Sequence, residues 1–298
     1  MSAEVVALAD ATRRPRHVAV GTFDGVHRGH RAVIEGADTV LTFDPHPTSV
    51  LHPAAAPKLL TTVARKAELV GGLGVAEMVV IPFDATFARQ EASAFIDEVL
   101  VGALGAREVA VGENFRFGHR AQGDPDLLRA DDRFVTREVK LLEIDGEVVS
   151  SSHIRGLIAG GAVDYAATLL GDPFVLERPV VHGDEMGRHL GYPTANLVPD
   201  DANALPGHGI YACSAQLEDG SEHAAAVSIG VRPTFASGRG ELVEAFVLDW
   251  EGDLYDTSLR LAFHKRLRGE RRFPTPEALV EQMHRDVEDT RRAMAGTH

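Results

Sequence analysis

The sequence predicts two domains of different class: an α/β N-terminal domain built on a parallel sheet, and a C-terminal small antiparallel β-barrel with a terminal helix. The chain has 298 residues, which is more than one compact domain usually contains. Short β-branched runs alternate with helix-like segments in the first half, whereas Gly and Pro separate short apolar runs in the second. A helix ending in LLGDP precedes this change, so we expect domains at 1–168 and 169–298.

Five β-branched runs predict the strands of the first domain. They are Val18–Val20, Thr39–Phe43, Glu77–Ile81, Glu108–Val111 and Glu138–Glu143. Helical patterns at 63–71 and 93–104 lie between them, which indicates βαβ units and an open parallel sheet. Ligands bind such sheets beyond the carboxyl ends of the strands. The polar motifs GTFDGVHRGH, DPHP and GENFRFG each follow a predicted strand, so we expect a ligand site there.

The second half predicts a barrel followed by a helix. The predicted strands are Val180-Val181, Ile210–Ala215, Ala224–Ile229, Leu242–Leu248 and Leu259–Phe263. Short strands without intervening helices favour an antiparallel barrel over further βαβ units. At the end of the chain, Thr275 is a candidate N-cap and Pro276 suits the first helical position. Apolar residues then recur every four positions, at Leu279, Met283 and Val287.

Composition and charge limit the classes of function. Hydrophobic residues make up 44% and charged residues 25%, which is typical of globular proteins. A formal net charge of −14 argues against broad nucleic-acid binding, and no apolar run reaches the roughly 18–20 residues of a membrane helix. The N-terminus lacks the order of a secretory signal, and the single Cys213 excludes an internal disulfide framework. We expect a cytoplasmic protein that binds small molecules and binds neither nucleic acid nor a membrane. The sequence does not indicate an oligomeric state.

The motif GTFDGVHRGH predicts a phosphate-binding loop. A strand leading through glycines into a helix presents backbone N–H groups to an anion, and Gly21, Gly25 and Gly29 allow close approach. His27 and His30 would lie on one face of the first helical turn and donate to phosphate oxygens. Two other interpretations stay open. The histidines are zinc ligands that need a third ligand from elsewhere, or they are ordinary residues of a helix-start loop.

Two further motifs supply polar groups for the same anion. In SSSHIR, the hydroxyls of Ser151 and Ser152 open a helix and Arg155 follows one turn later, although a plain serine N-cap would look the same. In GENFRFG, Asn114 can bond a phosphate. Two aromatic residues of that motif either stack on a flat ring or fill the core, namely Phe115 and Phe117.

The second half carries a separate cluster of polar residues. Glycines that suit a mobile flap over phosphates are Gly183, Gly187 and Gly191. Thr194 and Asn196 alternate along an extended segment, and their oxygens suit a partly hydrated Mg²⁺ completed by ATP phosphates. Glu244 lies in an otherwise apolar strand, where a carboxylate can take a proton from an alcohol that attacks the γ-phosphate. The alternative for Glu244 is an exposed glutamate on an edge strand.

In this order, the motifs resemble the bacterial bifunctional riboflavin kinase/FAD synthetase family. GTFDGVHRGH, TFDPHP, VGENFRFG and SSSHIR resemble its Rossmann-like nucleotidyltransferase half, while HGDEMGRHLGYPTAN, SIGVRPTF and VEAFVLDWEGDLYD resemble its flavokinase half. The resemblance implies phosphorylation of riboflavin to FMN with Mg²⁺ and ATP, then adenylylation of FMN to FAD with release of pyrophosphate. It also implies phosphate binding by Phe23, Asp24 and Arg188, and makes Glu244 the catalytic base. Alternatives are a monofunctional nucleotidyltransferase and a flavin-binding regulator without turnover.

The sequence departs from the family pattern at a few places. The segment Arg31–Asp38 is about ten residues shorter than usual before the next strand, so we expect a trimmed helix with the site retained. Ser152 replaces a threonine and keeps the hydroxyl. In the flavokinase half the departures are Ser228 for asparagine, Phe246 for histidine and Asp256 for glycine.

Overall fold

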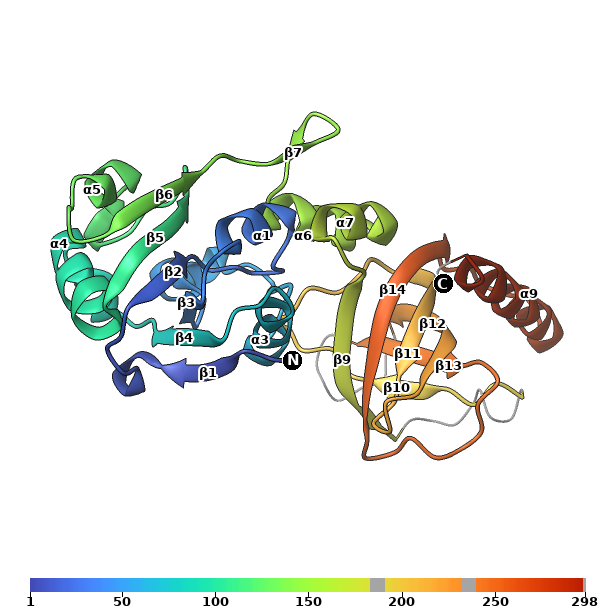
Figure 1. The fold of residues 1–298 in the computed structure, drawn as a ribbon. Helices are drawn as coiled ribbons and strands as arrows, with labels where there is room; N and C mark the ends of the chain where they lie inside the picture. Colours follow the sequence, from blue (N-terminus) through green and yellow to red (C-terminus); the bar gives the residue numbers. More distant parts are fainter. Residues whose placement is uncertain (183–190, 232–239, 297–298) are drawn as a thin grey trace. The chain divides into compact units, whose positions relative to one another are not determined.

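The computed structural model describes residues 1–182, 191–231 and 240–296, which form two compact units (Figure 1). The first unit is Met1–Ser151 and the second is Ser152–His298. The units divide after the first residue of helix α6 (Ser151–Gly160), which helix α7 (Val163–Leu170) follows. The predicted functional boundary at 168/169 lies inside α7, near its end, and stays a prediction.

The first unit contains a six-stranded parallel sheet in the order β1-β4-β3-β2-β5-β6. Its strands are β1 (Glu4–Ala7), β2 (Arg16–Val20), β3 (Thr39–Asp44), β4 (Glu77–Pro82), β5 (Ala106–Gly112) and β6 (Val135–Val139). A hairpin of β7 (Glu143–Ile144) and β8 (Glu147–Val148) follows. The α/β prediction is therefore confirmed.

The two edge strands of this sheet differ from the prediction. Sequence patterning missed β1, and the predicted strand Glu138–Glu143 is wrong in its bounds because β6 covers Val135–Val139. Each edge strand pairs with one neighbour only. No residue of β1 or β6 is fully buried, so neither strand has the burial pattern of a central parallel strand.

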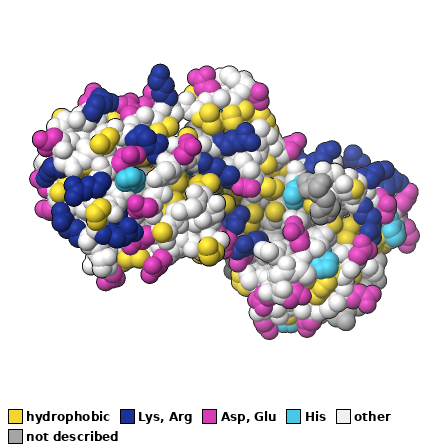
Figure 2. All heavy atoms as spheres, viewed as in Figure 1, with side chains coloured by type: hydrophobic (Ala, Val, Ile, Leu, Met, Phe, Trp, Pro, Cys, Tyr) yellow, Lys and Arg dark blue, Asp and Glu magenta, His cyan; other side chains and the backbone are white. Residues whose placement is uncertain are grey.

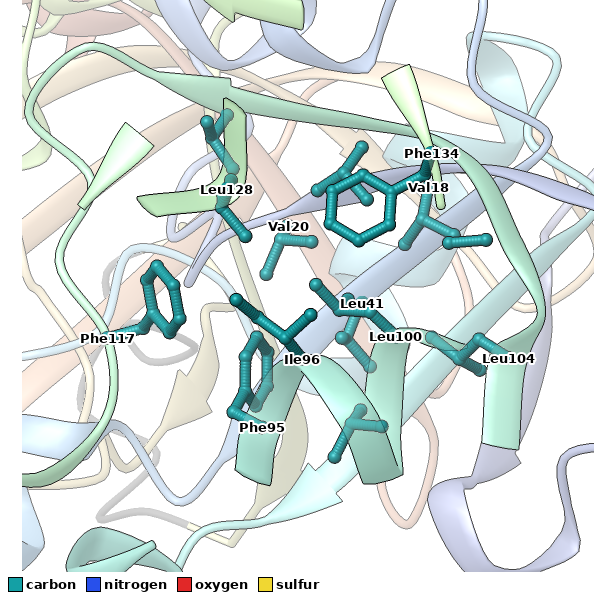
Figure 3. Packing of buried hydrophobic residues seen from close by; sticks show 14 of the residues in the cluster. Val18, Val20, Leu41, Phe95, Ile96, Leu100, Leu104, Phe117, Leu128 and Phe134 are labelled. Carbon is teal, nitrogen blue, oxygen red and sulfur yellow. The ribbon is translucent and has the colours of Figure 1, made fainter. Parts of the chain in front are cut away.

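Helices connect the strands and cover both faces of the sheet. They are α1 (Arg28–Ile34), α2 (Pro47–Leu51), α3 (Val63–Gly72), α4 (Ala92–Ala94) continuing into the π-helical segment η4 (Phe95–Leu104), and α5 (Pro125–Arg129). Short 3₁₀ turns are η1 (Leu8–Asp10), η2 (Pro53–Ala55), η3 (Phe87–Arg89) and η5 (His119–Ala121). Successive strand residues pack on opposite faces: Val18 and Val20 meet η4 (Figure 3), whereas Ala19 belongs to the cluster that includes α1 and α3 residues.

The chain order places a topological switch point between β2 and β5. From β2 the chain moves outward through β3 and β4, then returns to the other side of β2 with β5. Parallel sheets bind ligands outside the carboxyl ends of the strands at such a point. GTFDGVHRGH follows β2 and GENFRFG follows β5, so the fold puts both motifs at this location.

The second unit is a closed barrel of six strands in the order β10-β13-β12-β11-β14-β9, all antiparallel (Figure 1). The strands are β9 (Phe174–Val181), β10 (Ala195–Leu197), β11 (Gly209–Gln216), β12 (Glu222–Val231), β13 (Glu241–Val247) and β14 (Ser258–Arg268). The barrel prediction is confirmed, although it lacked the three-residue β10 and contained only the last two residues of β9, Val180 and Val181. Helix α7 packs on β9 and β14.

The terminal helix α9 (Pro276–Met294) begins as predicted, because the Thr275 side chain accepts a hydrogen bond from the Ala278 N–H at 3.3 Å. Its buried positions are polar: Asp286 is 5% exposed and Arg268 of β14 donates to both of its carboxylate oxygens, at 2.8 and 2.6 Å. An ion pair, in addition to the predicted apolar stripe, therefore holds α9 against the barrel. No helix in the described part of the chain is long and apolar enough to cross a membrane.

Candidate active sites

The two histidines of GTFDGVHRGH stand together at the start of α1. His27 is the N-cap, and its Nδ1 accepts a hydrogen bond from the His30 backbone N–H at 3.2 Å. The two rings stack with centroids 3.5 Å apart and an interplanar angle of 17°. The cap therefore fixes both imidazoles on one face of the first helical turn, as the spacing predicts.

The loop before α1 has a constrained backbone. Phe23 and Val26 have positive φ values of 47° and 41°, which are uncommon for residues other than glycine. The Phe23 ring meets the His30 ring edge-on with centroids 5.3 Å apart. A Cβ at Gly21 would lie 3.0 Å from the Phe23 ring, so the ring packs tightly over this glycine. The loop conformation thus directly affects where His30 lies.

Asp24 and Gly25, both predicted to bind phosphate, contact the segment before α3. The Asp24 carboxylate is 2% exposed and accepts hydrogen bonds from the Leu60 and Thr61 N–H groups at 2.9 and 3.1 Å. The Gly25 N–H donates to Thr61 Oγ1 at 3.1 Å. These contacts give both residues a structural role in holding the loop.

Sequence reasoning missed Lys66, a buried cation beneath this loop. Lys66 Nζ donates to the Thr22 carbonyl at 2.6 Å and to Thr42 Oγ1 at 3.2 Å. Burial lowers the pKa of Lys66 to about 8, while the nearby carboxylates of Asp24 and Asp44 act in the opposite direction. The sequence does indicate that Lys66 is buried, because this residue lies on the apolar face of its helix together with Val63, Ala67 and Val70.

The serine motif is divided between the two units. Ser151 Oγ donates to the Asp24 carbonyl at 2.9 Å, which ties the start of α6 to the first loop. Ser152 and Arg155 belong to the second unit, where Arg155 Nη1 lies 3.5 Å from Ser152 Oγ. Their predicted contact with phosphate stays a prediction.

The residues after β5 separate into exposed and buried groups. Asn114 is exposed, and Phe115 is half-buried and stacks on Phe117 with centroids 5.5 Å apart. Phe117 is 7% exposed and packs in the core near Phe95 (Figure 3). Of the two alternatives for Phe117, the structure shows core packing. Phe115 keeps an accessible surface, so it is the aromatic candidate for ring stacking.

Within residues 1–182, 191–231 and 240–296, no group of three or more His, Cys, Asp or Glu side chains has the arrangement of a metal site. The net negative charge is spread on the surface, with acidic and basic side chains interspersed on the visible face (Figure 2).

Glu244 lies beside Asn196 in the wall of the barrel. Register pairs Glu244 of β13 directly with Asn196 of β10 on one side and with Ser228 of β12 on the other. Directly opposed residues have Cβ atoms roughly 4.5–5.5 Å apart and project from the same face. Glu244 is half-buried, and β13 has neighbours on both sides, so the edge-strand alternative is wrong.

Asn196 is a candidate ligand for a metal ion. It is 4% exposed, and its Oδ1 has no hydrogen-bond partner among the described residues. A buried amide oxygen without a partner costs free energy unless something binds it, and a cation such as Mg²⁺ is a suitable group. Thr194, two residues earlier, is half-buried.

The segment before Thr194 is only partly described. Gly183, Gly187 and Arg188 lie outside the described residues, whereas Gly191 is exposed with φ of 85°. The adjacent Tyr192 hydroxyl is 2.6 Å from His284 Nδ1 of α9. Its ring also meets the Phe246 ring edge-on at 5.1 Å. Phe246, a departure from the family pattern, thus packs beside the predicted metal-binding segment.

Comparisons with known proteins find matches to both halves of the chain. Residues 9–153 match a family model described as FAD synthetase, and residues 170–294 match one described as riboflavin kinase. A solved structure from Streptococcus pneumoniae, described as a macrolide-efflux protein, has a TM-score of 0.88 at 27% identity and covers 96% of this chain and 98% of its own.

Curated relatives match nearly the whole chain. The bifunctional riboflavin kinase/FMN adenylyltransferase of Pseudomonas fluorescens is 37% identical over 291 residues, covering 92% of this chain and 93% of the relative. Proteins with the same description from Listeria monocytogenes and Escherichia coli K12 are 35% and 34% identical. They cover 92% and 94% of this chain, and 91% and 93% of their own lengths. The chain therefore belongs to the bifunctional riboflavin kinase/FMN adenylyltransferase family.

Proposed function

We propose that this chain makes FAD from riboflavin in two ATP-dependent steps, with residues 169–298 phosphorylating riboflavin and residues 1–168 adenylylating the resulting FMN. Both family models match, in the order that this division requires. The observation that carries the proposal is that each half retains a chemically suited group of side chains. These are the stacked imidazoles of His27 and His30, and the paired Asn196 and Glu244.

In the first step, Glu244 acts as general base for the 5′-hydroxyl of riboflavin. An alcohol is a weak nucleophile at neutral pH, so its attack on the γ-phosphate needs a proton acceptor. The half-buried position of Glu244 supports this role. Asn196 and Thr194 would hold Mg²⁺, which neutralises charge on the ATP phosphates when bound. The oxygen donors fit a hard cation, and so does Asn196 Oδ1, which has no hydrogen-bond partner in the part of the chain that the structure describes.

In the second step, the phosphate of FMN attacks the α-phosphorus of another ATP. This nucleophile is already anionic, so the site has to position the reactants and stabilise charge more than it has to remove a proton. His27 and His30 would donate to the phosphate oxygens, with Gly21 as the close-approach position of the loop. Ser151, Ser152, Arg155 and Asn114 would complete the phosphate contacts, and Phe115 would stack on the flavin.

The cellular location and the binding partners of the enzyme are part of the same proposal. It acts in the cytoplasm on riboflavin, FMN and ATP, and it uses neither nucleic acid nor a membrane. The interspersed surface charges and the net charge of −14 support small-molecule over nucleic-acid partners.

One experiment tests the pair of activities. The purified protein is incubated with riboflavin, ATP and Mg²⁺, and the flavins are separated by chromatography. We expect FAD to accumulate by way of FMN, and omission of Mg²⁺ to stop the conversion. FMN without FAD would indicate that adenylylation is lost. Unchanged riboflavin with FMN converted to FAD would indicate a monofunctional nucleotidyltransferase, and no conversion of either flavin would contradict the proposal.

A further inference from the structure

Lys66 connects helix α3 to the loop that carries the paired histidines. Its side chain is 6% exposed, and its ammonium group donates to the carbonyl of Thr22 and to the hydroxyl of Thr42. Thr42 Oγ1 donates to the same Thr22 carbonyl at 3.0 Å. One loop carbonyl thus receives two hydrogen bonds, one of them from a buried cation.

The Thr22 carbonyl lies at a sensitive point of the loop. The next residue, Phe23, has a positive φ, and its ring packs edge-on against the His30 ring. Residues with such φ values are strained and persist only where the surrounding structure holds them. A displacement of the Thr22 peptide would therefore reach His30 through Phe23.

Burying a lysine to hold a backbone carbonyl in place costs free energy. Desolvation penalises the ammonium and lowers the pKa of Lys66 to about 8, and the carboxylates of Asp24 and Asp44 offset only part of this effect. Ala67 and Val70 complete the apolar stripe of the helix, so a methionine at position 66 would avoid this penalty. The retained charge points to a contribution beyond stability.

We propose that Lys66 is a positioning residue for adenylyl transfer, which fixes the Thr22 carbonyl and thereby holds His27 and His30 in their geometry for the ATP phosphates. The proposal rests on the proposed function of the first unit. Lys66 does not touch the reacting atoms in this account, and acts only through the loop.

The test compares Lys66→Met, Lys66→Arg and the control Lys58→Met, which removes an exposed lysine eight residues away. FAD formation from FMN and ATP is measured at saturating substrate, together with the KM for ATP and the melting temperature. We expect Lys66→Met to lower kcat by about 10- to 100-fold with a KM change below about threefold, because misplacement affects chemistry more than ground-state binding. Lys66→Arg keeps the charge and donors and should recover part of the rate. Lys58→Met should match the wild type.

The pH profile provides a readout that a purely structural role would not change. As pH rises through about 8, the ammonium loses its proton and its charge-assisted bond to the Thr22 carbonyl. FAD formation relative to Lys66→Arg should therefore fall above pH 8, since arginine stays protonated. The free energy of unfolding changes in the opposite direction. Between pH 8 and 10.5 the unfolded chain binds more protons at Lys66 than the folded chain does, so the stability of the folded state rises with pH across that window.

The possible results decide between this inference and the proposed function. If the wild type makes FAD and Lys66→Met makes it equally fast, Lys66 has no positioning role. A wild-type kcat with a lowered melting temperature would likewise show a structural role only. If Lys66→Met does not fold, the pH profiles decide the question. The inference is overturned if FAD formation by the wild type does not fall relative to Lys66→Arg above pH 8. Failure of the wild type to convert FMN would instead contradict the proposed function.

Discussion

At the scale of single residues, Glu244 is the proposed base of the kinase step. Glu244→Gln keeps the shape and the pairing with Asn196 but removes the proton acceptor. We expect riboflavin phosphorylation to fall at least 100-fold, while FAD formation from supplied FMN stays within about twofold of the wild type. Glu241→Gln is the matched control, because Glu241 is on the same strand but an odd number of residues away and so projects from the other face. Equal loss of both activities in Glu244→Gln would contradict the division between the two halves.

The histidine pair predicts the opposite result. His27→Ala combined with His30→Ala removes both stacked imidazoles, and with them the predicted donors to the ATP phosphates. FAD formation from FMN should drop by about 10²- to 10³-fold, the range for loss of a donor that stabilises transition-state charge. Riboflavin phosphorylation should be retained. His17→Ala, an exposed histidine on β2, serves as the control. Unchanged FAD formation in the double variant would exclude the two histidines from the reaction.

At the scale of elements, the shortened helix α1 is stabilised from outside. It has only seven residues, and Arg137 of β6 donates to the carbonyls of Ala32, Val33 and Glu35 at its C-terminal end, at 3.2, 2.9 and 2.6 Å. These carbonyls have no partner within the helix, and a cation there also complements the helix dipole. The expected trimmed helix is confirmed, and Arg137 provides a physical reason for its stability.

This arrangement predicts that Arg137→Met loosens α1 selectively. Backbone amides of α1 should exchange with solvent at least tenfold faster, and FAD formation should decrease because His30 is on this helix. Hydrogen–deuterium exchange measures the first effect, and a flavin assay the second. Arg129→Met, which removes an exposed ion-pairing arginine of α5, should change exchange in α1 by less than twofold. Protection of α1 that survives in Arg137→Met would refute its capping role.

At the scale of the whole molecule, the compact units and the proposed functional halves divide at different residues. Helix α7 packs on strands of the barrel and buries Val163 and Ala166. A chain beginning at 169 lacks these side chains, whereas a chain beginning at 152 keeps them. We expect 152–298 to exceed 169–298 in free energy of unfolding by about 2 kcal/mol or more, measured by urea denaturation. Riboflavin kinase activity should be present in 152–298. Equal stability of the two shortened chains would show that α7 is dispensable for the barrel.

Much of the fold follows from local sequence alone. The central strands β2, β3, β4 and β5 each contain a short apolar run, because both faces of a parallel sheet are buried. The N-cap Thr275 and Pro276 define the start of α9 for reasons that lie within one helical turn. The edge strands β1 and β6 were predicted poorly because their residues are exposed or half-buried and lack the burial of the central strands.

The candidate sites, like the fold, follow partly from local sequence and partly from tertiary structure. Sequence determined which groups are candidates for the chemistry of this protein: paired histidines after a strand, the oxygens of Thr194 and Asn196 on an extended segment, and a lone carboxylate in an apolar strand. Only the tertiary structure decided that Glu244 opposes Asn196, that Phe117 fills the core, and that Asp24, Lys66 and Arg137 hold the loop and helix of the first site. These facts depend on strand register, burial and contacts between residues distant in sequence, and local patterning carries no information about any of them.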